Sequence, residues 1–134
     1  MTLYNPQAYL AAAWDWGCFD ECFTRGARIS DIDGVIDCDG HVCVIEAKPV
    51  GHELRDGQLR VFGALARLGV KVFIVYGKPG CPEFCQVVWP DGLSPMYAVD
   101  LETMREALRV WWKWADSHPA PNRLWRPCGG PWEK

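Results

Sequence analysis

Apolar and polar positions follow one another along this chain in patterns that predict both helices and strands. The strongest strand pattern is VKVFIVY, at residues 70–76, and it follows a helical pattern at residues 58–68 after a single glycine. Within the helical pattern, apolar residues such as Leu59 and Phe62 recur at three- and four-residue steps, which places them on one helix face. Gly69 is expected to cap this helix, because glycine readily adopts the left-handed backbone conformation that ends helices.

The remaining pattern predicts further elements on both sides of this helix and strand. Asn5 followed by Pro6 is typical of a helix start, and Asp100 is suited to cap the last helix. The full set expected is a helical region at 5–24, strands at 28–37, 41–47 and 70–76, a turn at 77–82, edge strands at 84–89 and 95–99, and helices at 58–68 and 101–116. This order indicates an α/β fold, with a mixed β-sheet flanked by helices.

Composition and length are those of one globular domain spanning residues 1–134, with a core at about 5–116 and an irregular tail at 117–134. The chain has 134 residues, of which 49% are hydrophobic and 23% are charged. Its apolar runs are shorter than the roughly 20 residues of a membrane helix, and its first residues have no signal-peptide pattern. We therefore expect a cytoplasmic protein with no membrane partner.

The dipeptide Asp39–Gly40 predicts a two-residue turn between two strands. With these residues as the loop, Cys38 pairs with His41, and each residue before the turn pairs with the one equally far after it. Asp33 therefore lies opposite Glu46. Directly opposed residues on a sheet have Cβ atoms about 4.5–5.5 Å apart, so these two carboxylates are expected close together.

A lysine joins this pair of carboxylates. Glu46 and Lys48 are two residues apart on one strand and share a face, so both converge with Asp33 on one side of the hairpin. The same register puts Asp31 opposite Lys48. A bulge, for which Gly34 is a suitable place, would make Asp31 the acting aspartate, whereas the unbroken register favours Asp33.

The residue types in this group point to chemistry on phosphodiester bonds. Two opposed carboxylates destabilise a sheet unless something compensates them, and a divalent metal ion would do so. Carboxylate oxygens suit magnesium, which keeps several waters and binds substrate phosphate, while a neighbouring lysine can position or deprotonate a water molecule. These parts are what metal-assisted phosphodiester hydrolysis requires. The alternative is a surface hairpin with scattered charges, but Glu46 and Lys48 interrupt a strand that otherwise has a buried pattern.

These residues resemble the signature of the PD-(D/E)XK nuclease superfamily. Asp33 followed by Glu46–Ala47–Lys48 is similar to that signature, and Gln58 at the start of a helix that ends in Gly69 is similar to its VRR-NUC-like branch. The phrase SDIDGVI before the hairpin also resembles small phage-borne nuclease-like proteins. The similarity covers residues 21–76, and it departs from the signature at Ile32, where the superfamily often has proline.

The resemblance implies a PD-(D/E)XK restriction-endonuclease-like core and a magnesium- or manganese-dependent endonuclease that acts on DNA. Lys48 would handle the attacking water, and Gln58 would orient the site or the DNA backbone. The implied metal ligands are Asp33, Glu46, the Ala47 carbonyl and, on the first helix, Glu21.

Charge determines where DNA is expected to contact the chain. The formal net charge is −3 and the sequence pI is near 5.5, so contacts with phosphate must come from a local basic patch. Such contacts are expected from Arg25, Arg28, His52 and Arg55, whereas Arg60 and Arg67 read as ordinary surface charge.

Two other interpretations stay open at this point. The first is a nuclease-like fold without activity that binds DNA or inhibits a protein partner, which the acidic pI and the tryptophan-rich last helix favour. The second is a structural α/β protein in which Cys18, Cys22, Cys81 and Cys85 hold zinc, rather than being reduced and packed as small apolar residues. A homodimer is expected if the protein cuts duplex DNA, because a two-fold axis would relate two sites.

Overall fold

The structure is a computed structural model that describes residues 5–121 of the chain. It divides into two compact units, residues 1–31 and residues 32–134, and each is described by itself. The expectation of one nuclease-like domain across the whole chain stays a prediction. Most of the irregular tail expected at 117–134 lies outside the described residues.

The N-terminal unit contains two short helices, where the sequence pattern predicted a helical region. The α-helix α1 (Pro6–Ala12) begins at Asn5, whose side chain accepts a hydrogen bond from the Ala8 N–H at 3.0 Å, as the Asn–Pro pair predicted. A 3₁₀ helix, η1 (Trp16–Cys22), follows, and the Asp15 side chain caps it. Neither helix contains a buried residue, and no other residue between 5 and 31 is buried, so this described part of the unit has no core of its own.

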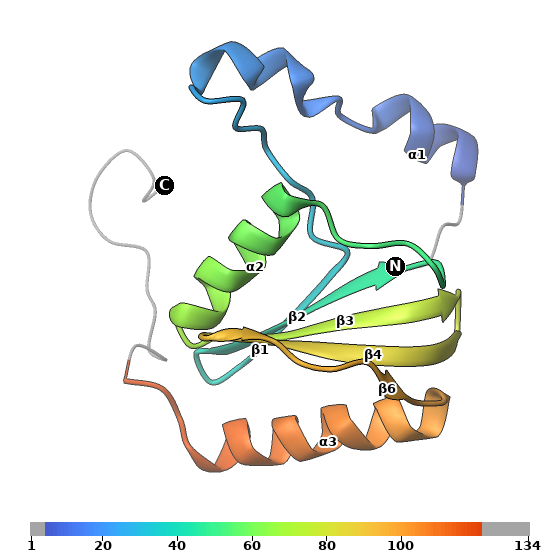
Figure 1. Ribbon diagram of the computed structural model, residues 1–134, viewed down its shortest axis with the longest axis vertical. Coiled ribbons are helices and arrows are strands. Elements are labelled where there is room, and N and C mark those ends of the chain that lie inside the picture. Colours follow the sequence, from blue (N-terminus) through green and yellow to red (C-terminus); the bar gives the residue numbers. More distant parts are fainter. Residues whose placement is uncertain (1–4, 122–134) are drawn as a thin grey trace. The chain divides into compact units, whose positions relative to one another are not determined.

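Within residues 5–121, six strands form one mixed sheet with the order β1-β2-β3-β4-β5, and β6 also pairs with β4 (Figure 1). The strands are β1 (Gly34–Cys38), β2 (His41–Lys48), β3 (Lys71–Lys78), β4 (Cys81–Trp89), β5 (Gly92–Leu93) and β6 (Tyr97–Ala98). The pairs β1–β2 and β3–β4 are antiparallel, whereas β2 and β3 are parallel. The mixed α/β fold expected from the sequence is therefore present.

The register of the β1–β2 hairpin is the predicted one. Cys38 pairs with His41 and Gly34 with Ile45, on either side of a two-residue turn. Both turn residues have positive φ, 49° at Asp39 and 86° at Gly40, which a turn of this type requires. The first strand is shorter than predicted, because it begins at Gly34 and residues 28–33 are not part of it.

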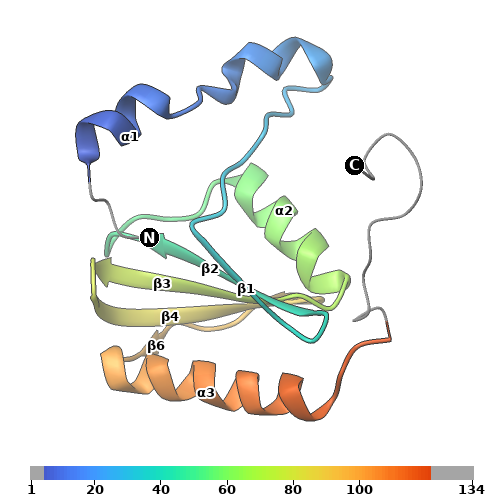
Figure 2. The same cartoon turned by 180° about the vertical axis from the view of Figure 1, so that it is seen from behind.

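The sheet is covered on both faces by helices (Figures 1 and 2). Helix α2 (Asp56–Arg67) packs Phe62 and Ala66 against one face, which presents Val44, Val72 and Ile74. Helix α3 (Leu101–Ser117) packs Met104, Trp111 and Ala115 against the other face, which presents Cys43, Phe73 and Cys85. Strands β2 and β3 are thus buried on both faces, as their continuous apolar sequences indicated.

The caps expected from the sequence are in place. At the end of α2, Gly69 has a φ of 93°, its N–H donates to the Ala66 carbonyl, and the Val70 N–H donates to the Leu65 carbonyl. These two bonds form a Schellman motif, which turns the chain directly into β3. At the start of α3, the Asp100 carboxylate accepts a hydrogen bond from the Thr103 N–H at 2.8 Å.

The turn predicted at 77–82 is wrong in its length, and its first residue, Gly77, belongs to a strand. Strand β3 continues through Gly77 to Lys78, and β4 begins at Cys81. At Gly77, where the register shifts, an added Cβ would come within 2.3 Å of the Cys81 carbonyl oxygen. Glycine is thus required for a close approach between two strands. Residues 84–89 are also not an edge strand, because β5 and β6 pair with parts of the outer side of β4.

Two thiols in the core make the stability of this fold dependent on pH. Burial raises the pKa of both Cys43 and Cys85 to about 11, from an ordinary value of 9.0. Because the folded state favours the neutral thiols, this contribution is fully present below pH 9 and is lost as pH rises toward 11. It amounts to roughly 3 kcal/mol per thiol.

We expect the free energy of unfolding, measured with urea, to fall between pH 9 and 11. In the double variant Cys43→Val and Cys85→Val, the fall should be smaller by several kcal/mol. A matched variant, Cys18→Ser and Cys81→Ser, replaces two exposed thiols and should keep the wild-type slope. An equal slope in all three proteins would contradict this assignment.

Candidate functional site

The candidate site lies where the β1–β2 pairing ends. Just before β1, Asp33 Oδ2 accepts a hydrogen bond from the Ala47 N–H at 2.9 Å, so a side chain continues the pairing beyond the last backbone pair, Gly34 with Ile45. The Asp33 side chain is exposed to solvent. The structure therefore brings one carboxylate against the middle residue of the sequence Glu46–Ala47–Lys48.

The residues on either side of Ala47 face helix α2. Glu46 and Lys48 alternate with Ala47 along β2 and lie on the face that also presents Val44. Glu46 is only 4% exposed, and Lys48 is half-buried. Because the N–H and C=O of one strand residue point to the same side, the Ala47 carbonyl points toward the side where Asp33 lies.

This arrangement offers oxygen atoms of the kind that a hard divalent cation binds. Asp33 and Glu46 supply carboxylates, one exposed and one buried, and Ala47, whose N–H binds Asp33, supplies a backbone carbonyl. A buried carboxylate is costly unless neighbouring charges or hydrogen bonds compensate it, and a divalent cation would add to that compensation. Oxygen atoms of the types that Asp33, Glu46 and Ala47 offer are those that magnesium or manganese binds.

Two neighbours of this group were not predicted from the sequence. In the parallel β2–β3 register Lys48 pairs with Tyr76, which is buried, and the Tyr76 hydroxyl donates a hydrogen bond to Gln86 Oε1 at 2.7 Å. Burial and the nearby Glu53 carboxylate raise the pKa of Tyr76. Tyr76 stands close to the end of its strand, but only the pairing of β2 with β3 links it to Lys48.

Gln58 has a clear structural contact. It lies in the first turn of α2, and its Oε1 accepts a hydrogen bond from the Arg55 N–H at 3.3 Å. The Gln58 side chain therefore caps the N-terminus of the helix. The sequence predicted a catalytic role for Gln58 but not this capping contact. Arg55 and His52 are exposed in the loop that leads from β2 to α2, as a role in DNA binding requires.

Other predicted site residues belong to the N-terminal unit. Glu21, Arg25 and Arg28 are exposed there, and Arg28 lies 3.8 Å from the Asp20 carboxylate. Their position relative to the hairpin stays a prediction. Asp31, the alternative metal ligand, accepts a hydrogen bond from the Trp16 indole N–H at 2.7 Å, whereas Asp33 contacts Ala47.

The zinc site of four cysteines is not supported by the structure. Cys81 and Cys85 lie four residues apart on the single strand β4. A strand rises about 3.3 Å per residue, so their Cα atoms are about 13 Å apart. That is too far for two ligands of one zinc ion with Zn–S bonds of about 2.3 Å. Cys85 is instead packed in the core, as the alternative of small apolar residues predicted. That alternative is wrong for Cys18, Cys22 and Cys81, which are exposed.

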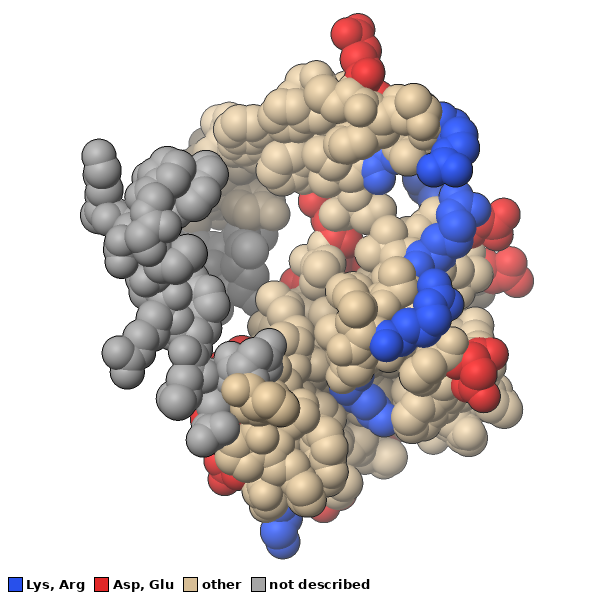
Figure 3. Space-filling view, turned by 90° about the vertical axis from the view of Figure 1, so that its left-hand side faces the viewer, with Lys and Arg blue, Asp and Glu red and all other residues tan. Residues whose placement is uncertain are grey.

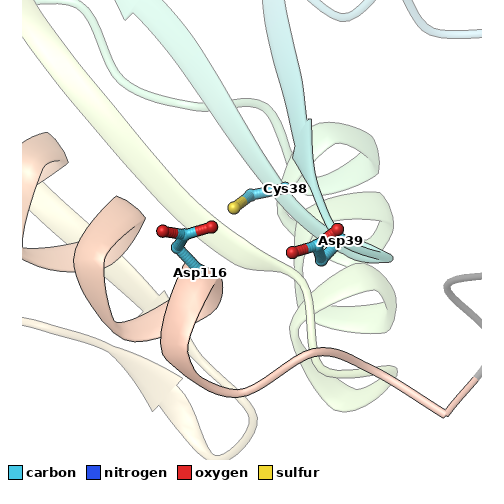
Figure 4. A group of neighbouring side chains, drawn as sticks. All are labelled: Cys38, Asp39 and Asp116. Carbon is cyan, nitrogen blue, oxygen red and sulfur yellow. The ribbon is translucent and has the colours of Figure 1, made fainter.

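A different group of metal-ligating residue types lies at the opposite end of the hairpin (Figure 4). One ligand atom each from Cys38, Asp39 and Asp116 lies within 4.8 Å of the others. Burial, followed by the negative charges of Asp116 and Asp39, raises the pKa of the Cys38 thiol. A metal that binds this group through sulfur would therefore have to displace the thiol proton.

Exposed arginines on helix α2 differ from those on α3 in their partners. Within residues 5–121, Arg60 and Arg67 form no ion pair, whereas Arg109 lies 2.9 Å from Glu102 and Arg105 lies 3.5 Å from the same residue. Figure 3 shows Lys and Arg side chains, in blue, exposed on this face of the molecule. The uncompensated charge on α2 is therefore available to an anionic partner.

Comparisons with protein-family models, curated proteins and solved structures found no match to this chain. In the part of the chain that the structure describes, no helix is both long enough and apolar enough to cross a membrane.

The contact of Gln58 predicts a stability effect that does not depend on catalysis. Gln58→Leu removes the acceptor for the Arg55 N–H and should lower the free energy of unfolding by about 1 kcal/mol, whereas Gln58→Glu keeps an acceptor and should not. Arg60→Leu, two residues further along the same helix at an exposed position, is the control. Urea unfolding measures all three, and an unchanged Gln58→Leu protein would disprove the capping role.

Proposed function

We propose that this protein is a metal-dependent endonuclease that hydrolyses DNA phosphodiester bonds on a PD-(D/E)XK-like core. The observation that carries the proposal is the Asp33 carboxylate bound to the Ala47 N–H, beside a buried Glu46 and a half-buried Lys48. The helix that follows β2 begins near Gln58, ends at Gly69 and leads into an apolar strand. This is the order that the resemblance to the superfamily implies.

In this proposal each residue of the hairpin has a separate task. Asp33, Glu46 and the Ala47 carbonyl would hold Mg²⁺ or Mn²⁺, which supplies Lewis acidity and acidifies a bound water. Glu46 is fixed by burial, and Asp33 is exposed where a substrate phosphate can approach. Lys48, on the same face as Glu46, would accept or hold a proton from the attacking water and offset negative charge on the phosphate.

DNA would approach from the loop between β2 and α2. His52 and Arg55 are exposed on this loop, and Arg60 and Arg67 extend the positive charge along α2. Seven residues of helix span about 10 Å, so the two helix arginines can contact different phosphates of one duplex. This use of Arg60 and Arg67 differs from the ordinary surface charge expected from the sequence.

The second candidate function is a nuclease-like fold that binds DNA or a protein without cleaving DNA. It is favoured by the aromatic side chains left exposed on α3, because Trp112 is 44% and Trp114 is 48% exposed, while Trp111 is buried in the core. Large exposed aromatic residues are frequent at protein interfaces. The two candidates differ in one measurable property, which is cleavage in the presence of metal. Under either, a homodimer remains a proposal.

Cleavage of DNA with Mg²⁺ or Mn²⁺ on duplex, branched and single-stranded substrates tests the enzyme. We expect Glu46→Gln and Lys48→Ala to lower the cleavage rate by at least about 100-fold, because each removes a group that acts on the metal, water or phosphate. Asp37→Asn is the control, since Asp37 is an exposed carboxylate on β1, the other strand of the hairpin, near the turn. No cleavage by the folded wild-type protein on any substrate would favour the binding module.

The salt dependence of DNA binding tests the surface on α2. The double variant Arg60→Gln and Arg67→Gln should reduce the slope of log K against log salt concentration by about 1 to 2, as expected when one or two phosphate contacts are lost. The variant Arg105→Gln and Arg109→Gln removes the same charge from α3, where acidic residues pair with both arginines. Equal slopes for the two variants would show that α2 is not the DNA surface.

A further inference from the structure

A second concave site lies at the opposite end of β3 from Tyr76. It is a hollow of about 850 Å³ between α3, the start of β3 and the end of β4. Ligand pockets for small molecules typically measure about 300–1,000 Å³ and are mainly apolar. The walls of this hollow include Val70, Lys71, Phe73, Trp89, Val110 and Trp111.

Large apolar side chains that line the hollow are exposed to solvent. Trp89 is 46% and Val110 is 61% exposed, and both line the hollow, whereas Trp111 is buried at its base. Exposed aromatic faces favour stacking against another aromatic ring, since stacked or edge-on pairs gain about 0.5–1.5 kcal/mol beyond the area that they bury. The shape and the lining therefore favour a flat, apolar ligand.

One cation stands among these aromatic rings. The Lys71 Nζ lies 4.1 Å from the centre of the Trp89 ring and 5.3 Å from that of Phe73. Lys71 is half-buried, and burial lowers the pKa of its ammonium group. Within residues 5–121 no carboxylate forms an ion pair with it. An anion placed beside this ammonium would therefore gain a charged partner in a partly desolvated site.

Among the described residues that line the hollow, one carries a carboxylate, and an arginine already pairs with it. Glu106 lies on α3, and its Oε2 is 3.2 Å from the Arg109 guanidinium. The positive charge of Lys71 consequently dominates the field inside the hollow. An anionic ligand would meet attraction from Lys71 and little repulsion from Glu106.

We propose that this hollow is a binding site for a small aromatic anion, with its ring system against Trp89 and Trp111 and its anionic group at Lys71. The site is separate from the proposed nuclease site. Lys71 is the first residue of β3, whereas Lys48 pairs with Tyr76 near the other end of that strand. A carboxylate, sulfonate or phosphate satisfies the same requirement for negative charge.

A matched pair of fluorescent probes tests this proposal on the full-length protein. The first, 8-anilinonaphthalene-1-sulfonate, is an aromatic anion, and the second, N-phenyl-1-naphthylamine, has the same ring system without the sulfonate. We expect the sulfonate to bind saturably at one site per chain. Lys71→Met keeps an unbranched side chain without its charge and should weaken sulfonate binding at least tenfold, with less than a threefold effect on the neutral probe.

Two further variants make the test decisive. Lys78→Met removes an exposed lysine at the other end of β3 and should leave both probes unaffected. Val110→Glu places a carboxylate at an exposed position of the hollow, where folding should tolerate it, and should abolish sulfonate binding. Equal affinity of the sulfonate for wild type and Lys71→Met would overturn the proposal. The proposal would also be overturned if the sulfonate did not bind to wild type, or bound without saturation. Such a result is expected if another part of the chain or a second copy fills the hollow.

Discussion

The register of the β1–β2 hairpin is the constraint on which the candidate site depends. The turn residues Asp39 and Gly40 both have positive φ, and this geometry fixes which residues pair across the two strands. A slip of one residue would move every side chain of a strand to the opposite face. Glu46 would then leave the face covered by α2, and Asp33 would lose its contact with the Ala47 N–H.

The sheet adds a second constraint, because its two central strands are buried on both faces. Parallel pairing of β2 with β3 needs a crossover, which α2 provides, and the Schellman motif at Gly69 makes the return to β3 short. Polar residues can enter such strands only near their ends. Glu46 and Lys48 lie near the carboxyl end of β2, and in open α/β sheets ligands commonly bind outside the carboxyl ends of the strands.

The two ends of β3 present different chemistry on opposite faces of the sheet. Tyr76, near the carboxyl end, lies on the α2 face, near the Glu53 carboxylate and paired with Lys48 of β2. Lys71, at the amino end, shares the α3 face with Phe73 and is enclosed by aromatic rings. Alternation along one strand thus separates the proposed site for a metal and phosphate from the hollow proposed for an aromatic anion.

Sequence alone determined what depends on neighbouring residues, and tertiary structure decided what depends on distant ones. The Asp39–Gly40 turn and the Gly69 cap follow from local backbone preferences, and the first of these fixed the pairing that leads to Asp33 and Glu46. Gly77 looked like part of a turn, but the approach of another strand explains it. Similarly, Tyr76 came next to Lys48 only through the parallel pairing of β2 with β3. Such contacts join segments far apart in the chain, so no local pattern encodes them.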